Sequence, residues 1–500
     1  MTRSIQRSLR AVRYHPVVEQ IALAAAGRGC LPVYLVGGFL RDALLRHPGA
    51  LDIDLVCADP PLLGAALAQR FAGTIVHLAE RLWRVIFAHR QERGQVDIGP
   101  LRGGRILEDL RHRDFTVNAL AISLEDDPPR LMDPTGGLRD LKAARIRVTT
   151  PEVLTEDPLR LLRSIRLAAQ LGFRIEKRSA EAIRRRALLL RRAAPERLRE
   201  EFFDILNAPD AGRWLAAMDA LALLEALVPE TRPLRGCLQG PPHRFDVLAH
   251  SLETVRALDR ILRRLPGLLP QEAASVIARL ETEVEGGVTG TALLRFTALV
   301  HDVGKPDVRA IEDGRVRFLG HAERGAEIVE EISRRLRLGS RATAMAVTIV
   351  REHLRPLHLR HTPRITARAR YRFWRDLGPL AADCLLLSLA DIRATAAREG
   401  RAFREHRRFV QEMFTFHRRR MAAAEARGRR GRLLDGHELM ARMRLSPGPF
   451  VGFLLARLDE EAGLGALRSK QEALRHLKRH LPALRQEFAR ASRLDLSRQG

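Results

Sequence analysis

The chain has 500 residues, 46% of them hydrophobic, which is enough for about three packed domains. Its 86 Lys and Arg outnumber its 60 Asp and Glu, so the formal net charge is +26. Because basic surfaces bind phosphates by releasing counterions, we expect a polyanionic partner. The four cysteines form no C-x-x-C motif, which argues against a zinc ribbon or a disulfide framework. No signal segment and no apolar run of membrane-spanning length is present, so we expect a soluble cytoplasmic protein without a membrane partner.

The stretch from Val36 to Leu55 carries the strongest local signal. Apolar residues predict a short strand at Val33–Val36 that ends at Gly37-Gly38, and a helix is expected over Phe39–Arg46. Glycine N–H groups at the start of a helix, with no side chain in the way, suit a triphosphate. Gly37 and Gly38, with Arg41 in the helix, are therefore candidate nucleotide-binding residues.

Asp52 and Asp54 fall in a second predicted strand, after a Pro48-Gly49 turn. Residues i and i+2 of a strand point to the same face, so the two carboxylates would project side by side. They repel each other unless a cation lies between them, and a divalent ion such as Mg²⁺ is the usual answer. A D-x-D alone is more often a surface strand with two solvated acids. Together with the glycine pair, it predicts metal-dependent nucleotidyl transfer.

Short strands and helices alternate through the rest of the first 150 residues. We expect a helix at Leu62–Phe71 and strands at Thr74–Leu78, Trp83–His89, Gln95–Ile98 and Arg145–Val148, the last directly after a glycine turn at Asp133–Leu141. Asp97 is a candidate third carboxylate if its strand lies beside that of Asp52 and Asp54. Otherwise it is an ordinary acid at a strand end.

Two polar sets follow on predicted helices. Between Asp109 and Ala121, helical spacing brings together Arg113, Asp114 and Asn118, which can offer donors and an acceptor to a ribose or a phosphate. A helix cap with a surface Arg–Asp pair is the alternative.

From residue 151 the pattern becomes helical, and Asp157, Arg160 and Arg163 fall on one face. An Asp–Arg pair can make fork-like hydrogen bonds to a base edge, but in isolation a solvated face with an internal ion pair is the commoner arrangement. Pro195-Glu196-Arg197 begins another predicted helix.

Residues 230–242, rich in Pro and Gly, read as a linker to a second helical domain. That domain carries an ordered set of possible metal ligands: His250, His301, Asp302, His321, His353 and Asp391. Histidine and carboxylate ligands suit a divalent transition metal or Mg²⁺, and such a site can activate water. His243, His358 and His361 have no place in the pattern. Any one of these histidines alone would be an ordinary core or surface residue.

The last hundred residues begin with basic helical runs, at Arg401–Arg408, His417–Arg420 and Arg427–Arg432, which are typical of a solvated or RNA-facing surface. The segments Leu434–Met440 and Pro447–Gly452 and a final amphipathic helix follow. The expected organisation is a head domain at 1–150, a helical neck and body at 151–235, the ligand-bearing domain at 236–400 and a basic helical region at 401–500.

In order, these motifs resemble the bacterial CCA-adding enzyme and poly(A) polymerase family, the class II tRNA nucleotidyltransferases. The motifs are Gly37-Gly38 with Asp52/Asp54, Arg113-Asp114-Phe115-Thr116 with Asn118, Asp133-Pro134 with Gly136-Gly137, and Glu156-Asp157-Pro158 with Arg160. The ordered His/Asp set resembles an HD phosphohydrolase domain. The resemblance implies an α+β fold: a polymerase-β-type nucleotidyltransferase head with a mixed sheet, then helical neck, body, HD and C-terminal regions.

The resemblance also implies roles and partners. Asp52 and Asp54 would hold two Mg²⁺ ions, with Asp97 as the third catalytic carboxylate, and Gly37 and Gly38 would contact the phosphates. Arg113, Asp114 and Asn118 would select the ribose, and Asp157 and Arg160 would read the incoming base without a nucleic-acid template. The partners would be tRNA, CTP and ATP, with no DNA. The reaction would add CMP and AMP, as CCA or part of it, to the 3′ end of the tRNA, with release of pyrophosphate.

Two departures from the family bear on the product. Only Gly99–Glu108 separates the strand of Asp97 from the Arg113 motif, whereas CCA-adding members have a flexible loop there. Members limited to CC addition resemble this short state. The Arg- and His-rich sequence of enterobacterial poly(A) polymerases is not evident, which weighs against poly(A) synthesis. Two alternatives to nucleotidyl transfer come from other classes of protein: an HD phosphohydrolase on an RNA-binding scaffold, and an RNA-binding module with degenerate sites.

Overall fold

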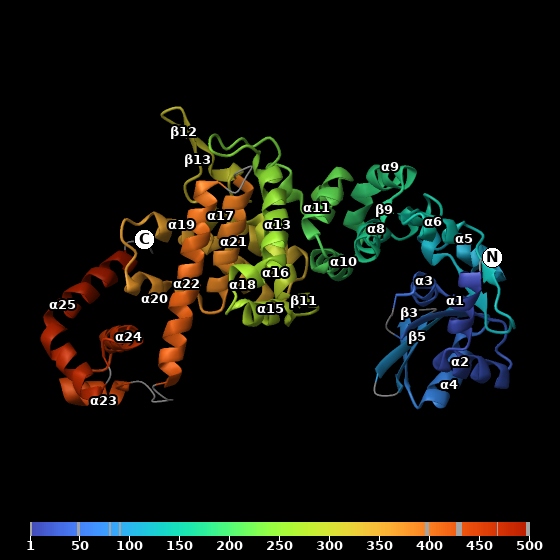
Figure 1. Ribbon diagram of the computed structural model, residues 1–500, viewed down its shortest axis with the longest axis horizontal. Helices are drawn as coiled ribbons and strands as arrows, with labels where there is room; N and C mark the ends of the chain where they lie inside the picture. The colour runs from blue at the N-terminus through green and yellow to red at the C-terminus, as the bar shows by residue number, and fades with distance from the viewer. Residues whose placement is uncertain are drawn as a thin grey trace. The chain divides into compact units, whose positions relative to one another are not determined.

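The structure is a computed structural model that describes residues 3–47, 51–79, 82–89, 92–395, 400–426, 433–467 and 469–496. The chain divides into two compact units, Met1–Pro229 and Glu230–Gly500. The first is coloured blue to green in Figure 1 and the second green to red. The predicted Pro48-Gly49 turn and the basic run Arg427–Arg432 lie outside the described residues.

A seven-stranded mixed sheet forms the base of the first unit, with strand order β3-β4-β5-β2-β1-β6-β7. Its strands are β1 (Val33–Val36), β2 (Asp52–Cys57), β3 (Thr74–Ala79), β4 (Leu82–His89), β5 (Glu92–Pro100), β6 (Ala121–Ser123) and β7 (Leu131–Met132). β2 pairs in parallel with β5 and antiparallel with β1. The predicted mixed sheet is therefore confirmed.

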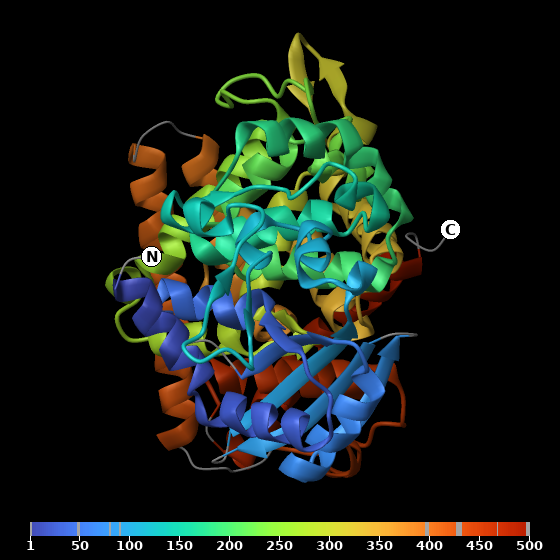
Figure 2. The same cartoon turned by 90° about the vertical axis from the view of Figure 1, so that its right-hand side faces the viewer.

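Helices α1 (Arg3–Arg13), α2 (Pro16–Gly27), α3 (Gly37–Leu45) and α4 (Pro60–Phe71) accompany this sheet. α4 packs against β3, β4 and β5, and α2 packs against α4 (Figure 2). Alternate residues of β2, such as Ile53 and Leu55, are fully or almost fully buried, while Asp52 is exposed. The period-2 pattern of this strand therefore separates its apolar core face from its carboxylate face.

The segment from Asp109 to Ala121 is not the continuous helix expected from its spacing. α5 (Ile106–Arg111) ends before Arg113, and only a 3₁₀ turn forms at Thr116–Asn118. Phe115 instead makes an antiparallel bridge with Val148. Tertiary pairing therefore overrides the local helical preference.

A short helix separates the glycine turn near residue 136 from the expected strand, which forms at Arg145–Ile146. α6 (Gly137–Lys142) begins at the glycine turn because the Asp133 carboxylate accepts hydrogen bonds from the N–H groups of Gly137 and Leu138 (2.7 and 3.0 Å). β8 (Arg145–Ile146) then pairs in parallel with β9 (Arg174–Ile175). Helices complete the first unit: α7 (Val153–Glu156), α8 (Arg160–Leu171), α9 (Lys177–Arg186), α10 (Pro195–Asn207), α11 (Ala211–Ala220) and α12 (Leu223–Leu227), with 3₁₀ turns at Arg102–Gly104, Ala187–Arg192 and Pro229–Thr231.

The second unit is helical, as predicted, apart from two small hairpins. Its first helices are α13 (Val247–Arg263), α14 (Leu265–Leu268), α15 (Ala273–Glu281), α16 (Gly290–Val300), α17 (His321–Arg335), α18 (Ser340–Glu352), α19 (Arg355–His361), α20 (Ala367–Leu377), α21 (Leu380–Thr395) and α22 (Arg401–Ala426). β10 (Glu283–Glu285) pairs with β11 (Val288–Thr289), β12 (Ala310–Glu312) pairs with β13 (Arg315–Arg317), and a 3₁₀ turn lies at Pro306–Val308. α13 lies against both α16 and α21 and so occupies the middle of this bundle (Figure 1).

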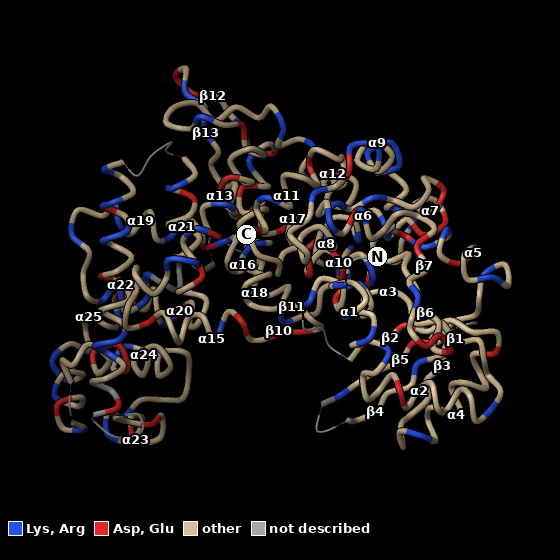
Figure 3. Tube along the Cα trace, turned by 45° about the vertical axis from the view of Figure 1, so that its right-hand side comes forward, with Lys and Arg blue, Asp and Glu red and all other residues tan. Residues whose placement is uncertain are grey.

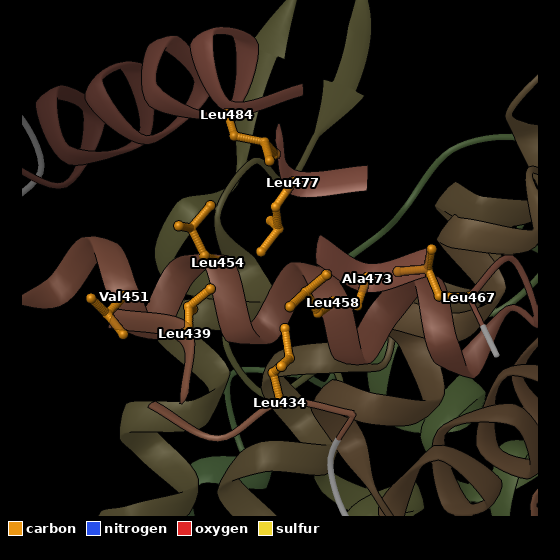
Figure 4. Packing of buried hydrophobic residues seen from close by; sticks show 9 residues of the cluster. All are labelled: Leu434, Leu439, Val451, Leu454, Leu458, Leu467, Ala473, Leu477 and Leu484. Atoms are coloured by element: carbon orange, nitrogen blue, oxygen red, sulfur yellow. The ribbon is translucent and has the colours of Figure 1, made fainter. Parts of the chain in front are cut away.

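The last three helices, α23 (Gly436–Met443), α24 (Pro449–Gly463) and α25 (Lys470–Leu496), share a small apolar core. Figure 4 shows Leu439, Leu454 and Leu477, one from each helix, among its members. An Asp435–Glu438 capping box starts α23. The three helices therefore pack through their own leucines.

Lys and Arg (blue in Figure 3) occur along both units rather than in one segment. Within the described residues, no helix is both long enough and apolar enough to span a membrane.

Candidate active site and metal centre

The head carboxylates lie on two neighbouring strands. Asp52 and Asp54 occupy the start of β2, and Asp97 of β5 stands directly opposite Asp54 in the parallel register. The strand of Asp97 therefore lies beside that of Asp54, which was the condition for its candidacy as a third carboxylate.

Each of these carboxylates has a different environment. Asp97 accepts two hydrogen bonds from Arg84 of β4, each 2.7 Å long, and Asp52 accepts one from Gln95 (2.8 Å). Burial, opposed by Arg113 and reinforced by the charges of Asp52 and Asp97, raises the pKa of Asp54 to about 6. Asp54 is thus the carboxylate that a bound cation would relieve most.

Gly37 fits closely against Asp54. Its φ is +77°, and a Cβ at this position would overlap Asp54 Oδ2. The N–H of Gly38 donates a hydrogen bond to the same carboxylate. Gly37 and Gly38 form the N-terminus of α3. Because neither has a side chain, their backbone can lie directly against Asp54.

A polar network extends from the glycine turn. Arg41 holds Asp42 in a fork (2.8 and 3.0 Å) and donates from Nη1 to Asn118 Oδ1 (2.8 Å). Asn118 Nδ2 donates to Asp114 Oδ1 (3.2 Å), and Arg163 Nη1 lies 3.4 Å from Asp114 Oδ2. The structure thus brings together four residues that the sequence singled out separately.

The remaining predicted nucleotide-binding residues have other partners. Asp157 lies just before α8 and pairs with Arg197 of α10 (3.2 Å), while Arg160 Nη1 donates to the carbonyl of Val153 (3.0 Å). Arg113 Nε donates to Asp109 (3.0 Å) rather than to Asp114. Each of these three side chains is therefore held by another residue of the first unit.

The sequence patterns did not indicate two acidic residues and one arginine near this site. Glu201 of α10 is buried and binds both Arg163 and Arg166 (3.3 and 2.6 Å). Arg84 and Asp109 complete the set. An arginine inside an apolar strand, as at position 84, could have indicated a buried acidic partner.

In the second unit, the six predicted ligands come from five helices or helix ends and meet around Asp302. Its Oδ2 lies 3.1 Å from His301 Nε2 and 3.7 Å from His250 Nε2. Its Oδ1 lies 3.4 Å from His321 Nε2 and 3.8 Å from His353 Nε2. Asp391 Oδ1 lies 3.0 Å from His250 Nε2. Asp302 therefore belongs to two groups of closely spaced ligand atoms, one with His250 and His301, the other with His321 and His353.

The imidazoles are oriented as metal ligands usually are. The Nδ1 atoms of His301, His321 and His353 lie 2.9, 2.7 and 2.6 Å from the backbone carbonyls three residues earlier. An Nδ1–H that donates to a carbonyl leaves Nε2 with a lone pair directed at the cluster. Nε2 of His250, His301 and His321 is buried without a hydrogen-bond partner. These donors fit a divalent ion.

Charge within the cluster is consistent with this fit. Burial alone would raise the pKa of Asp302, but His301 and Lys305 hold it well below its usual range. Burial, followed by the charge of His301, lowers the pKa of His353 to about 3. An anionic Asp302 and a neutral His353 are the protonation states that a metal requires. Burial lowers the pKa of His301 but Asp302 raises it above its usual value, so His301 would release a proton when a metal binds.

A cavity of about 760 Å³ opens onto this cluster. His243 and His358, which had no place in the sequence pattern, line it together with Arg355. Lys305 also lines it and binds Asp302 and Gln239 (2.6 and 2.7 Å). The spacing of three residues between Asp302 and Lys305 could have predicted their contact from the sequence. The position of His243 could not be predicted, because it depends on the loop before α13.

Comparison with known families covers most of the chain. The family described as "Poly A polymerase head domain" matches residues 33–147, "Probable RNA and SrmB- binding site of polymerase A" matches 172–234, and "HD domain" matches 247–396.

Among curated proteins, an A-adding tRNA nucleotidyltransferase of Deinococcus radiodurans is 36% identical over 88% of this chain and 93% of its own. A CC-adding tRNA nucleotidyltransferase of Thermus thermophilus is 32% identical over 88% and 91%.

Solved structures show the same fold. A CCA-adding enzyme in complex with CTP matches with a TM-score of 0.65 and 22% identity, over 95% of this chain and 97% of the other. A Thermotoga maritima CCA-adding enzyme complexed with tRNA matches with a TM-score of 0.62 and 21% identity, over 93% and 96%. With the identity to the curated relatives, these matches show that the chain belongs to the family of tRNA nucleotidyltransferases and poly(A) polymerases.

Proposed function

We propose that the chain adds CMP to the 3′ end of tRNA from CTP, without a template and with release of pyrophosphate. The observation that carries the proposal is the position of Asp52 and Asp54 beside the glycine pair at the start of α3. This arrangement places carboxylates for a metal next to N–H groups for a triphosphate. The relatives named above act on tRNA, which supports the acceptor.

Asp52 and Asp54 would hold Mg²⁺, which when bound would supply a polarised 3′-hydroxyl and charge neutralisation for the triphosphate. Attack by that hydroxyl on the α-phosphorus forms the new phosphodiester and expels pyrophosphate. Arg84 keeps the Asp97 carboxylate oriented beside Asp54.

The other residues select the nucleotide. The network of Arg41, Asn118, Asp114 and Arg163 would position the ribose. Asp157 and Arg160 would exchange their present contacts with Arg197 and Val153 for the base edge. Because a base edge offers both donors and acceptors, an Asp and an Arg can read it directly.

The short connection after β5 supports addition of two CMP residues. β5 ends at Pro100 and α5 begins at Ile106, so a single 3₁₀ turn at Arg102–Gly104 spans the gap. Family members that add the full CCA have a flexible loop here. A-addition is the second candidate, because the Deinococcus relative that is 36% identical is an A-adding enzyme.

Extension of a tRNA that lacks its CCA end, with labelled CTP or ATP, tests this function. We expect CMP incorporation by the wild type and none by Asp52→Asn. Asp59→Asn, two residues after the end of the same strand, is the charge-matched control, because asparagine still caps α4 there. Loss of activity in the control alone, or extension by Asp52→Asn, would refute the proposal.

We also propose that the cluster around Asp302 holds a divalent transition metal or Mg²⁺ and hydrolyses a phosphate ester. The orphaned Nε2 atoms of its histidines support this. Metal analysis of wild type and Asp302→Ala, with phosphatase and 2′,3′-cyclic phosphodiesterase assays, tests it. Equal metal content in both proteins would contradict it.

As a tRNA-processing protein, the chain would act in the cytoplasm.

A further inference from the structure

A second cavity in the Glu230–Gly500 unit belongs to neither site described above. Its volume is about 830 Å³, and its walls come from α13, the turn around α14, α21 and α22. α21 packs against both α13 and α22, so the three long helices form a continuous wall (Figure 1). This volume lies within the range of cavities that bind small organic ligands.

The lining of this cavity combines an apolar floor with a ring of cations. Ile261, Leu389 and Phe403 are buried at its base. Its lining includes five arginines, which are Arg260, Arg263, Arg264, Arg393 and Arg407. No Asp or Glu is among the described residues that line it.

Two of these guanidinium groups retain unused donor capacity. Arg260 pairs through Nη2 with Glu253, but its Nε is buried without a hydrogen-bond partner. Arg407, on the facing helix α22, makes no ion pair with any residue that the structure describes. An anionic ligand would give an acceptor to the buried Nε of Arg260 and a counter-charge to the exposed guanidinium of Arg407.

The walls are held in place without a ligand. Gln411 of α22 donates to the carbonyl of Leu268 (2.9 Å), and Arg418 of the same helix binds Glu272 (2.8 Å). Both contacts fix α22 against the segment around α14. A preformed site loses less conformational entropy when it binds.

We propose that this cavity binds a nucleotide unit, with phosphate oxygens on Arg260 and Arg407 and the base over the apolar floor. Arginine forks match phosphate geometry, and guanidinium groups and Phe403 offer surfaces on which a base can lie. The same chemistry is available from a free nucleotide and from one nucleotide of a bound RNA. The inference concerns a binding site apart from the head and does not depend on nucleotidyl transfer.

The test compares the full-length Arg260→Gln/Arg407→Gln variant with Arg256→Gln/Arg408→Gln. The control removes two charges from the same helices, and Arg256, like Arg260, pairs with Glu253. In the first arm, calorimetric titration with ATP should show one binding site fewer in the cavity variant than in the wild type and the control. This result identifies a free nucleotide as the ligand.

In the second arm, binding of tRNA is measured over a series of salt concentrations. If RNA supplies the nucleotide, the slope of log affinity against log salt should be shallower by about 1 for each arginine removed from the cavity. Unchanged ATP stoichiometry together with a slope equal to that of the control would overturn the proposal. Arg407→Gln alone, a change at an exposed residue, gives the same comparison if the double variant unfolds.

Discussion

Replacing Asp54 by asparagine should abolish nucleotidyl transfer and yet stabilise the metal-free protein at neutral pH. Burial, with the charges of Asp52 and Asp97, raises the pKa of Asp54 from 3.8 to about 6. In the unfolded chain the carboxyl ionises near its usual pKa, so folding holds a proton that the unfolded state releases. Stability is therefore highest below that usual value and is lost as the pH rises through about 6.

The size of this effect follows from the shift. A difference of about 2 pKa units corresponds to about 3 kcal/mol, all of it lost above the folded pKa. Asparagine has the same shape and no charge, so it should recover most of this free energy. For a unit of this size, about 3 kcal/mol raises the melting temperature by roughly 6–12 °C.

The assay is thermal unfolding of the wild type and Asp54→Asn in EDTA and in excess Mg²⁺, above and below the Asp54 pKa. In EDTA the variant should melt higher above this pKa, by less between this pKa and 3.8, and equally only below 3.8. Mg²⁺ should stabilise the wild type and not the variant, because a ligand that binds only the native state adds its binding free energy. If the variant melts lower than the wild type in EDTA above this pKa, the proposed cost of ionising Asp54 is wrong.

Three further changes test the two sites. Gly37→Ala should reduce transfer at least about 100-fold, as expected when a reacting group is displaced. The added Cβ would overlap Asp54 Oδ2, and the φ of +77° at this position disfavours alanine. Steady-state kinetics measures the loss, and activity within a few-fold of wild type would contradict it. Arg84→Gln should lower kcat more than it raises the KM for CTP, because it leaves Asp97 without its fork; a change in KM alone would count against this role. Asp302→Asn should remove most of the bound metal from the second unit while leaving CMP incorporation intact, as elemental analysis and the extension assay would show; joint loss of both activities would contradict the separation.

The local patterns around Val36–Leu55 predicted the strand, the helix and the paired carboxylates correctly, because each depends on residues close in sequence. The partner of Asp97 could not be predicted. Arg84 reaches it only because β4 and β5 pair with Arg84 opposite Asp97. Strand register is a tertiary property, and a shift of one residue would turn Arg84 to the other face.

The expected helix around Arg113 failed for a similar reason. Phe115 pairs with Val148, and the N–H of Thr116 donates to the carbonyl of Arg147 (2.9 Å). These partners lie about 30 residues away in sequence, and their pairing outweighs a weak local helix propensity. In the second unit, the ordered ligands were visible in the sequence, but His243 joins them through a loop whose course the sequence did not reveal.

Sequencing of the 3′ ends of a tRNA that stops at its discriminator nucleotide, after incubation with CTP, ATP or both, tests the central claim most directly. We expect two added C residues with CTP, no further A with both nucleotides, and no addition by Asp52→Asn. Addition of A alone would assign the second candidate activity. A homopolymer of A on this and on unrelated RNA, or no extension with either nucleotide, would contradict the proposed function.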